Sequence, residues 1–179
     1  EVRKHDLYTQ FAFGSTEQAI QDSGLDLEKI DHERVGVIWG AGIGGLQTFF
    51  EEVRTYNEEN PRFSPFFIPK MIANIAGGLI SIKYGFNGPN FTAVSACASA
   101  SHAMIEAFNM IRLGKADIMI TGGSEAGINE AGMTGFTSMK AVSTRNDDPK
   151  TASRPFDLDR DGFVMGEGSA AFVFEDYES

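Results

Sequence analysis

The single cysteine of this sequence, Cys97, lies in a segment whose residue types could perform covalent chemistry. An apolar run at 91–95 predicts a strand, small residues follow it, and a helix is predicted to begin at Ser99. Cys97 would then lie near the helix N-terminus, where unpaired amides and the helix dipole stabilise a thiolate. Small neighbours would leave room for a carbonyl group that the thiolate attacks. Inert, buried cysteines are nevertheless common, and spacing alone favours that interpretation.

A glycine-rich motif, GAGIGG at 40–45, follows a predicted strand at 35–39 and fits the G-x-G-x-x-G pattern of dinucleotide-binding loops. Such loops also require a second strand that ends in an acidic residue about 20 residues later. The corresponding region, 57–66, contains two prolines and has no strand pattern. The motif therefore indicates a tight turn in which glycine permits close packing, and no cofactor is expected.

The elements that must position these residues follow from hydrophobic periodicity and from glycine and proline positions. Helices are predicted at 7–23, 46–56, 68–84 and 99–113, and strands at 35–39, 91–95, 117–121, 163–164 and 170–174. Gly122 and Gly123 are expected to end the third strand, and 127–155 is expected to be mostly loop. The alternation of strands and helices indicates an α/β fold with a layered sheet.

Composition narrows the classes of function. The sequence has 179 residues with 42% hydrophobic and 22% charged side chains, which suits one globular domain with a real core. A formal net charge of −10 opposes general binding to nucleic acid, so no nucleic acid partner is expected. No apolar run reaches the roughly 18 residues of a membrane helix, so no membrane insertion is expected. One cysteine allows no internal disulfide, and a cytoplasmic location is expected.

Several stretches, taken together and in order, resemble one family, the condensing β-ketoacyl synthases. They are GIGG at 42–45, SPFFIP at 64–69, YGFNGP at 84–89, SAC at 95–97, AD to GGSE within 116–125, AVSTRN at 141–146, ASRPFD at 152–157 and RDGFVMGEG at 160–168. The resemblance is strongest to the type II enzymes of bacterial fatty acid synthesis and covers nearly the whole chain. It makes Cys97 the expected acyl-accepting nucleophile, and it outweighs the preference for an inert cysteine that spacing alone indicates.

The resemblance implies a thiolase-like αβαβα layered sandwich, of which residues 1–179 would be mostly the N-terminal half, incomplete at both ends. It also implies a homodimer without cofactor or metal. Cys97 would take an acyl group from acyl carrier protein, with its own amide as one donor of the oxyanion hole. Malonyl-acyl carrier protein would then lose carbon dioxide and attack the thioester, giving a 3-oxoacyl chain that is two carbons longer.

The resemblance also assigns roles to residues away from Cys97. Four apolar residues would shape the acyl tunnel: Ile43, Phe67, Ile68 and Phe136, with Phe67 and Ile68 reaching the neighbouring subunit. Three basic residues would meet the acidic carrier protein: Arg3, Lys4 and Lys140. Core packing and solvated surface are the alternatives for these two sets. Five charged residues in the later loops are interpreted as scaffold ion pairs and turns: Arg145, Arg154, Asp157, Asp161 and Glu167.

The sequence departs from the family in its histidines. The family uses two catalytic histidines in its second half, whereas this sequence contains only His5, His32 and His102. His5 and His32 are expected to be solvated. His102 follows Cys97 by five residues, which on one helix would turn it about 140° away, so it is interpreted as structural.

Two classes of function therefore remain. The first is a condensing acyltransferase of fatty acid synthesis, or a polyketide-type ketosynthase. The second is a truncated, noncatalytic module that binds acyl groups or dimerises. The loop sequence at 143–168 favours the first class over a thiolase or a chalcone-type synthase.

Overall fold

The computed structural model describes residues 4–177. The chain forms two compact units, one made of the residues up to Ala126 together with those from Gly168 onward, and one made of Gly127–Glu167. Each unit is described by itself.

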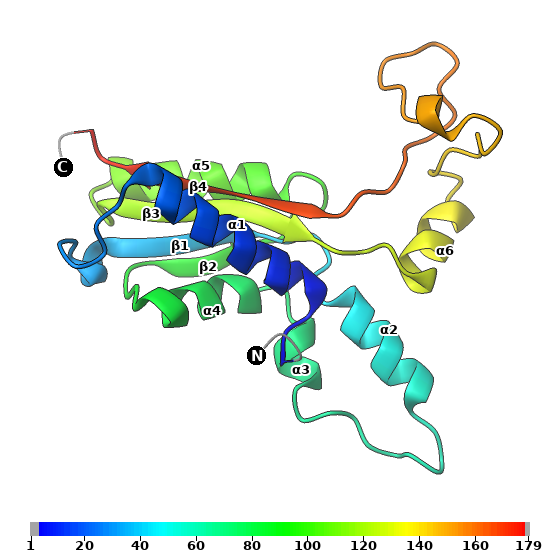
Figure 1. The fold of residues 1–179 in the computed structure, drawn as a ribbon, viewed down its shortest axis with the longest axis horizontal. Coiled ribbons are helices and arrows are strands. Elements are labelled where there is room, and N and C mark those ends of the chain that lie inside the picture. The colour runs from blue at the N-terminus through cyan, green and yellow to red at the C-terminus, as the bar shows by residue number, and fades with distance from the viewer. Residues whose placement is uncertain (1–3, 178–179) are drawn as a thin grey trace. The chain divides into compact units, whose positions relative to one another are not determined.

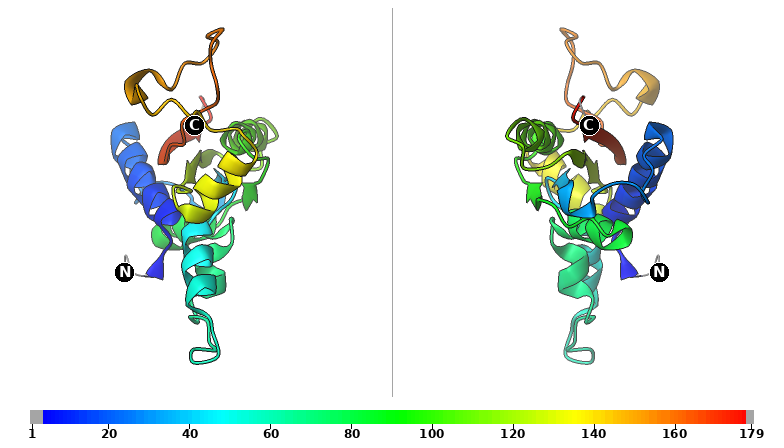
Figure 2. Two further views of the ribbon diagram at one scale, coloured as in Figure 1. Left: turned by 90° about the vertical axis from the view of Figure 1, so that its right-hand side faces the viewer. Right: turned by 90° about the vertical axis from the view of Figure 1, so that its left-hand side faces the viewer.

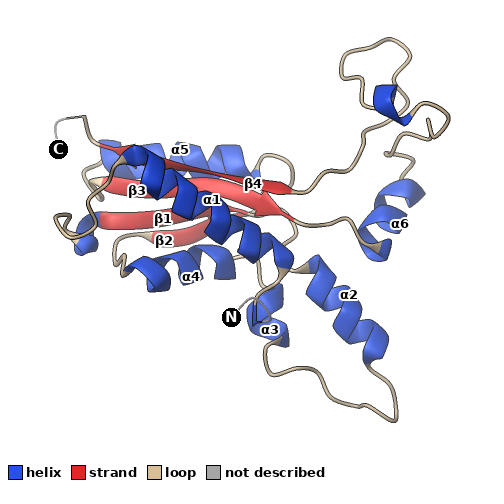
Figure 3. Cartoon of the chain, in the orientation of Figure 1, coloured by secondary structure: helices blue, strands red, loops and turns tan. Residues whose placement is uncertain are grey.

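The first unit is built on a four-stranded sheet with the order β2-β1-β3-β4 (Figure 3). The strands are β1 (Val35–Gly40), β2 (Asn90–Ala93), β3 (Ile118–Glu125) and β4 (Gly168–Glu175). Strands β2, β1 and β3 are parallel, and β4 pairs antiparallel with β3. The predicted α/β class is confirmed, and the carboxyl ends of the three parallel strands meet at one edge of the sheet.

Helices cover both faces of this sheet. Helices α1 (Leu7–Ser23) and α4 (Ile75–Tyr84) pack on one face, and α5 (Ser99–Arg112) packs on the other (Figures 1 and 2). Alternate residues of β1 point to opposite faces, as a strand requires. Val37 and Trp39 join the core beneath α1 and α4, whereas Ile38 joins the core beneath α5. Because both faces are covered, every residue of β1 is buried.

Helix α1 has the bounds that the sequence predicts. It is capped by Asp6, whose carboxylate accepts the Tyr8 amide at 3.3 Å, and it ends at Gly24, which adopts a positive φ of 71°. Helix α2 (Leu46–Thr55) and helix α5 also lie close to their predicted positions.

The helix predicted at 68–84 is wrong, because this segment forms two helices. Helix α3 (Phe67–Met71) ends before α4 begins at Ile75. The Met71 carbonyl accepts the Gly45 amide at 2.9 Å, and the Ile72 carbonyl accepts the Tyr8 hydroxyl at 2.6 Å. Burial raises the pKa of Tyr8 to about 12, which keeps this hydroxyl protonated as a donor. Contacts with distant segments therefore satisfy groups that a continuous helix would pair internally.

The prediction that Gly122 and Gly123 end the third strand is also wrong. Strand β3 continues to Glu125 and stays paired with β4 as far as Gly168. Gly122 has a φ of 149°, and a side chain there would lie 2.1 Å from the Ala170 carbonyl oxygen. Glycine therefore allows the two strands to remain in close register instead of ending one of them.

The second unit contains a helix, α6 (Glu130–Ser138), where the sequence predicts mostly loop. Asn129 caps this helix by accepting the Gly132 amide at 2.9 Å, and Phe136 packs edge-on against Phe163 at 5.3 Å between ring centroids. The predicted strand at 163–164 is a single bridge between Val142 and Phe163. Short 3₁₀ helices are formed by His32–Arg34 in the first unit and by Pro149–Thr151 in the second.

Charged residues of the second unit hold turns, as the sequence predicts. Asp161 accepts the Ser143 hydroxyl at 2.6 Å and the Thr144 amide at 3.0 Å, and these bonds lower the pKa of Asp161. Glu167 accepts the Ile128 amide at 2.7 Å. Arg145 donates to the Asp159 carbonyl, and Arg154 donates to the Thr151 carbonyl. The Asp157 carboxylate accepts the Asp159 amide.

His32 is half-buried, so the expectation that it is solvated holds only in part. Its two ring nitrogens lie 2.9 Å from the Leu27 carbonyl and 3.1 Å from the Gly85 carbonyl. These bonds raise the pKa of His32, and the bond to Leu27 contributes most. Two carbonyl acceptors favour the imidazolium, because only that form donates from both ring nitrogens.

Candidate active site

Cys97 lies on a tight turn between β2 and α5. The strand ends at Ala93, the helix begins at Ser99, and the thiol of Cys97 is exposed. Ala96 has a φ of 51°, a left-handed conformation that is uncommon for a residue with a side chain. A strained turn directly before an exposed thiol resembles the geometry of a nucleophile elbow, and the exposure of Cys97 excludes a buried cysteine.

The turn opens onto a cavity of about 300 Å³ at the carboxyl ends of β1 and β3. Cys97 lines this cavity together with mainly glycine, alanine and serine residues and a single carboxylate, Glu125. Ligands of open α/β sheets bind at the carboxyl ends of parallel strands. The cavity therefore combines an exposed thiol with space for a small planar group such as a thioester carbonyl.

Two glycines explain how α5 comes so close to the sheet. A Cβ atom added at Gly40 would lie 2.5 Å from the Ala100 backbone nitrogen. One added at Gly123 would lie 2.7 Å from the Ala100 Cβ atom. The first turn of α5 thus rests directly on the ends of β1 and β3, which fixes the turn that carries Cys97 relative to the cavity.

Glu125 is a site residue that sequence reasoning missed. It is the last residue of β3, and its Oε1 atom accepts the amides of Gly42 and Ile43, the latter at 3.0 Å. Burial raises the pKa of Glu125, while the two amides oppose the increase. An acidic residue at the end of a strand parallel to β1 was the available signal, because that strand end must meet the loop after β1.

This carboxylate also accounts for the glycine motif. The Gly42 and Ile43 amides, which a dinucleotide-binding loop would offer to phosphate, are occupied by an anion from the same chain. The strand that follows the motif is β2, which begins only at Asn90. Both observations support the interpretation of 40–45 as a structural turn.

Replacing Glu125 with glutamine tests this arrangement. An acid whose folded-state pKa is raised adds stability below its unfolded pKa, and this stability is lost as the pH rises through the folded pKa. Glu125→Gln keeps an oxygen acceptor for both amides and removes the charge. We expect its urea midpoint to exceed that of the native chain near pH 7 and to lose this advantage near pH 4. Glu59→Gln, at an exposed loop position, is the control; a Glu125→Gln chain that is less stable at every pH would contradict the expectation.

The three predicted tunnel residues of the first unit, Ile43, Phe67 and Ile68, are not among the residues that line the cavity of Cys97. Ile43 lies beside it on the loop that Glu125 holds, with an exposed side chain. Phe67 lies in α3 and stacks on Phe63 with ring centroids 4.7 Å apart, and Ile68 is exposed. Phe136 lies in the second unit.

The predicted basic patch is only partly described. Lys4 and Lys140 are exposed, and Lys140 has a positive φ of 56°. Lys140 belongs to the second unit. Arg3 lies outside the described residues.

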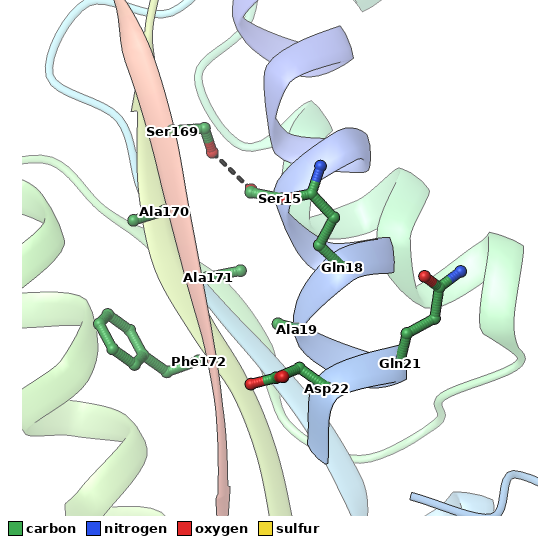
Figure 4. A pocket seen from close by; sticks show the side chains of 9 residues that line it. All are labelled: Ser15, Gln18, Ala19, Gln21, Asp22, Ser169, Ala170, Ala171 and Phe172. Carbon is green, nitrogen blue, oxygen red and sulfur yellow. Dashed lines mark hydrogen bonds between the residues drawn. The ribbon is translucent and has the colours of Figure 1, made fainter. Parts of the chain in front are cut away.

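A larger groove of about 720 Å³ runs between α1 and β4 (Figure 4). Ser15 and Ser169 point toward one another across it and share a hydrogen bond of 2.7 Å. Alanines, glutamines and Asp22 supply most of the remaining lining, and no thiol or imidazole is among the lining residues. The larger groove therefore offers less chemistry than the cavity of Cys97.

A sheet with helices on both faces and an exposed cysteine turn at its carboxyl edge places the chain in the thiolase-like fold class. All of the chain, residues 1–179, matches the family described as "Beta-ketoacyl synthase, N-terminal domain", and the chain belongs to this family.

Curated relatives make this membership more specific. The chain is 46% identical to 3-oxoacyl-[acyl-carrier-protein] synthase 2 of Synechocystis sp., over 100% of its own length and 43% of the relative's. It is also 46% identical to the protein of the same name from Coxiella burnetii, over 99% of the chain and 43% of that protein. The chain thus spans less than half the length of these relatives.

Solved structures confirm the predicted fold. A β-ketoacyl synthase from Burkholderia phymatum superposes with a TM-score of 0.85 and 31% identity, over 98% of this chain and 43% of that one. A ketosynthase complex with a type II polyketide acyl-carrier protein gives a TM-score of 0.80 at 24% identity, over 98% of this chain and 48% of that one. The prediction of an N-terminal half of a thiolase-like fold is therefore confirmed.

None of the helices within residues 4–177 has the length and apolar character needed to cross a bilayer.

Proposed function

We propose that this chain provides the acyl-accepting half of a 3-oxoacyl-[acyl-carrier-protein] synthase of fatty acid synthesis, with Cys97 as the nucleophile. The observation that carries the proposal is the exposed thiol on a strained turn that opens onto a cavity of about 300 Å³. The 46% identity to synthases of this name over the full chain supports fatty acid synthesis over a polyketide pathway.

In the acylation step, the Cys97 sulfur attacks the carbonyl carbon of an acyl thioester on the carrier protein. A new C–S bond forms, and the carbonyl oxygen becomes an oxyanion. The Cys97 amide is not among the hydrogen-bond donors of the turn within the described residues, and it is proposed to donate to this oxyanion. The bond to the carrier sulfur then breaks, and the carrier thiol leaves with the proton that the Cys97 thiol gives up. The acyl group remains on Cys97 as a thioester.

Condensation is proposed for the protein that carries this segment. Malonyl-acyl carrier protein would lose carbon dioxide, and its carbanion would attack the Cys97 thioester, releasing the thiolate and a 3-oxoacyl-acyl carrier protein. The family resemblance assigns decarboxylation to two histidines of the second half, so the residues of this chain are proposed to perform acylation.

Acyl carrier protein and a second copy of the chain are the proposed partners. Exposed Lys4 and Lys140 give local positive charge on a chain with a net charge of −10, which suits an acidic carrier.

Phe67 and Ile68 are proposed to enter the partner subunit's acyl site. Their helix carries exposed apolar surface next to a stack of aromatic rings formed by Phe49, Tyr56, Phe63 and Phe67, and such surface is typical of interfaces. Ile43 and Phe136 are proposed to complete the acyl tunnel, and the reduced thiol suits the cytoplasm.

The test is incubation with acyl-acyl carrier protein, followed by intact mass measurement and peptide mapping. We expect one acyl mass, located on Cys97. Addition of malonyl-acyl carrier protein then separates the two classes of function: carbon dioxide and a 3-oxo product indicate complete condensation, and a stable acyl-Cys97 without them indicates an acyl-binding module. A native chain that gains no acyl mass from carriers loaded with short, medium or long chains would overturn the proposal.

A further inference from the structure

The turn that carries Cys97 depends on side chains from the helix that follows it. Ala96 adopts a left-handed conformation that alanine does not favour, so other contacts must hold it there. Two backbone bonds close the turn, from the Ala98 amide to the Ser95 carbonyl at 3.1 Å and from the Ser99 amide to the Ala96 carbonyl at 3.1 Å. These bonds leave the Ser95 amide and hydroxyl to be held by side chains.

Ser99 holds the inner side of the turn. It is buried, with 4% of its surface exposed, and its hydroxyl accepts the Ser95 amide at 2.9 Å and donates to the Ala96 carbonyl at 2.7 Å. The Ser99 hydroxyl therefore links the Ser95 amide to the carbonyl of Ala96, the residue with the left-handed conformation.

His102 holds the outer side. Its Nδ1 atom lies 2.7 Å from the Ser95 hydroxyl, and its own amide donates to the Ala98 carbonyl at 2.9 Å. The interpretation that helical spacing turns His102 away from Cys97 does not apply, because Cys97 precedes the first residue of α5. From α5 the imidazole reaches back to the residue that begins the turn.

We propose that His102 is a positioning residue that acts through the Ser95 hydroxyl to hold the 95–97 turn, so that the Cys97 thiol faces its cavity. The inference rests on the proposed acylation of Cys97. Ser95 links the two braces, since Ser99 holds its amide and His102 holds its hydroxyl. The hydrogen bond of the imidazole is to Ser95, so the role assigned to His102 is on geometry and not on proton transfer.

The chain has one thiol, so the rate of alkylation by iodoacetamide reports Cys97 alone. Ser95→Ala and His102→Ala should each lower the rates of alkylation and of acyl transfer about fivefold, the effect of one neutral hydrogen bond. The double variant should be no slower than either single variant, because both remove the same bond. His102→Asn, whose amide can replace Nδ1, should recover most of the rate, and His102→Gln should not. The urea midpoints of these variants should equal the midpoint of Ser101→Ala, a control at an exposed position on the same helix.

The outcomes separate this inference from the proposed function. Native rates in His102→Ala, or losses that multiply in the double variant, would overturn the positioning role even where Cys97 is acylated. Slow alkylation in His102→Ala, rescued by asparagine, supports the role even where the native chain accepts no acyl group, in which case the proposed function alone fails. A variant whose slower rate is matched by a lower urea midpoint and is not rescued by asparagine indicates a general loss of structure, which also contradicts the inference.

Discussion

Cys97→Ala is expected to abolish covalent acylation and to leave the fold intact. The sulfur is the only thiol of the chain, and it lies on the turn that opens onto the site cavity. Because it is exposed, its removal loses little packing, and the free energy of unfolding should change by less than about 0.5 kcal/mol. Intact mass after incubation with acyl-acyl carrier protein should show no increase, whereas the native chain gains one acyl group.

Cys97→Ser is the matched variant. It keeps a nucleophilic atom on the same turn, but a serine hydroxyl without a neighbouring base is a weak nucleophile. Its acylation should be far slower than that of the native chain at an equal urea midpoint. An alanine variant that still gains the acyl mass would move the acceptor to another residue, and the nearby Ser95 hydroxyl would be the first position to examine by peptide mapping.

Local sequence signals were sufficient for most elements of this fold and for the strand-to-helix turn that carries Cys97. Helix α1 begins at its aspartate cap and ends at a glycine, so both bounds could be predicted. Strand β1 is an apolar run between turn residues. Cys97 was found because a strand, small residues and a helix follow one another within a few positions, and the family resemblance selected the reactive interpretation.

Features that depend on contacts between distant segments could not be predicted in the same way. The 68–84 segment is broken because its Met71 and Ile72 carbonyls accept donors from Gly45 and Tyr8. Strand β3 passes through two glycines because β4 approaches too closely for a side chain at Gly122. In both cases a local stop or continuation signal was overridden by tertiary packing.

The site shows the same division. Glu125 is far from Gly42 in sequence, and only the parallel pairing of β1 and β3 brings its carboxylate to that loop. The helical angle expected between Cys97 and His102 does not apply, because Cys97 precedes the first residue of α5, and the interpretation of His102 as structural stays a prediction. Helix α6 was missed because its glycines and threonines are poor helix formers, although Asn129 supplies the cap and Phe136 the packing.

The close contact between the sheet and α5 leads to the second large expected effect. At Gly40 the three atoms nearest to an added Cβ atom would all be backbone atoms of α5, the Ala100 nitrogen being the nearest at 2.5 Å, so the first turn of the helix must move. Gly40→Ala should lower the free energy of unfolding by about 1–3 kcal/mol, the usual cost of overpacking. It should also slow acylation of Cys97, because the displaced helix carries the turn with it. Urea unfolding and the rate of acyl transfer measure the two effects.

Gly78→Ala is the control for this substitution. Gly78 lies in α4, and an added Cβ atom would meet nothing within 4 Å. Alanine in a helix is more stable than glycine by about 0.5–1 kcal/mol, so this variant should be at least as stable as the native chain and should be acylated at the native rate. Native stability and native acylation in Gly40→Ala would contradict the close contact.

A second substitution, Ala100→Gly, distinguishes the effects of the two glycines that border α5. At Gly123 the nearest atom to an added Cβ is the Ala100 Cβ at 2.7 Å, whereas at Gly40 it is the Ala100 backbone nitrogen. Ala100→Gly removes the Ala100 Cβ from the space at Gly123, where the Gly40 carbonyl oxygen at 2.9 Å remains, and it leaves the backbone obstacle at Gly40 in place. Acylation lost in Gly123→Ala should therefore return in part when Ala100→Gly is added, and acylation lost in Gly40→Ala should not. Equal rescue of both variants would mean that α5 yields as a whole, and the Cys97 turn would then not be fixed by its contact with the sheet.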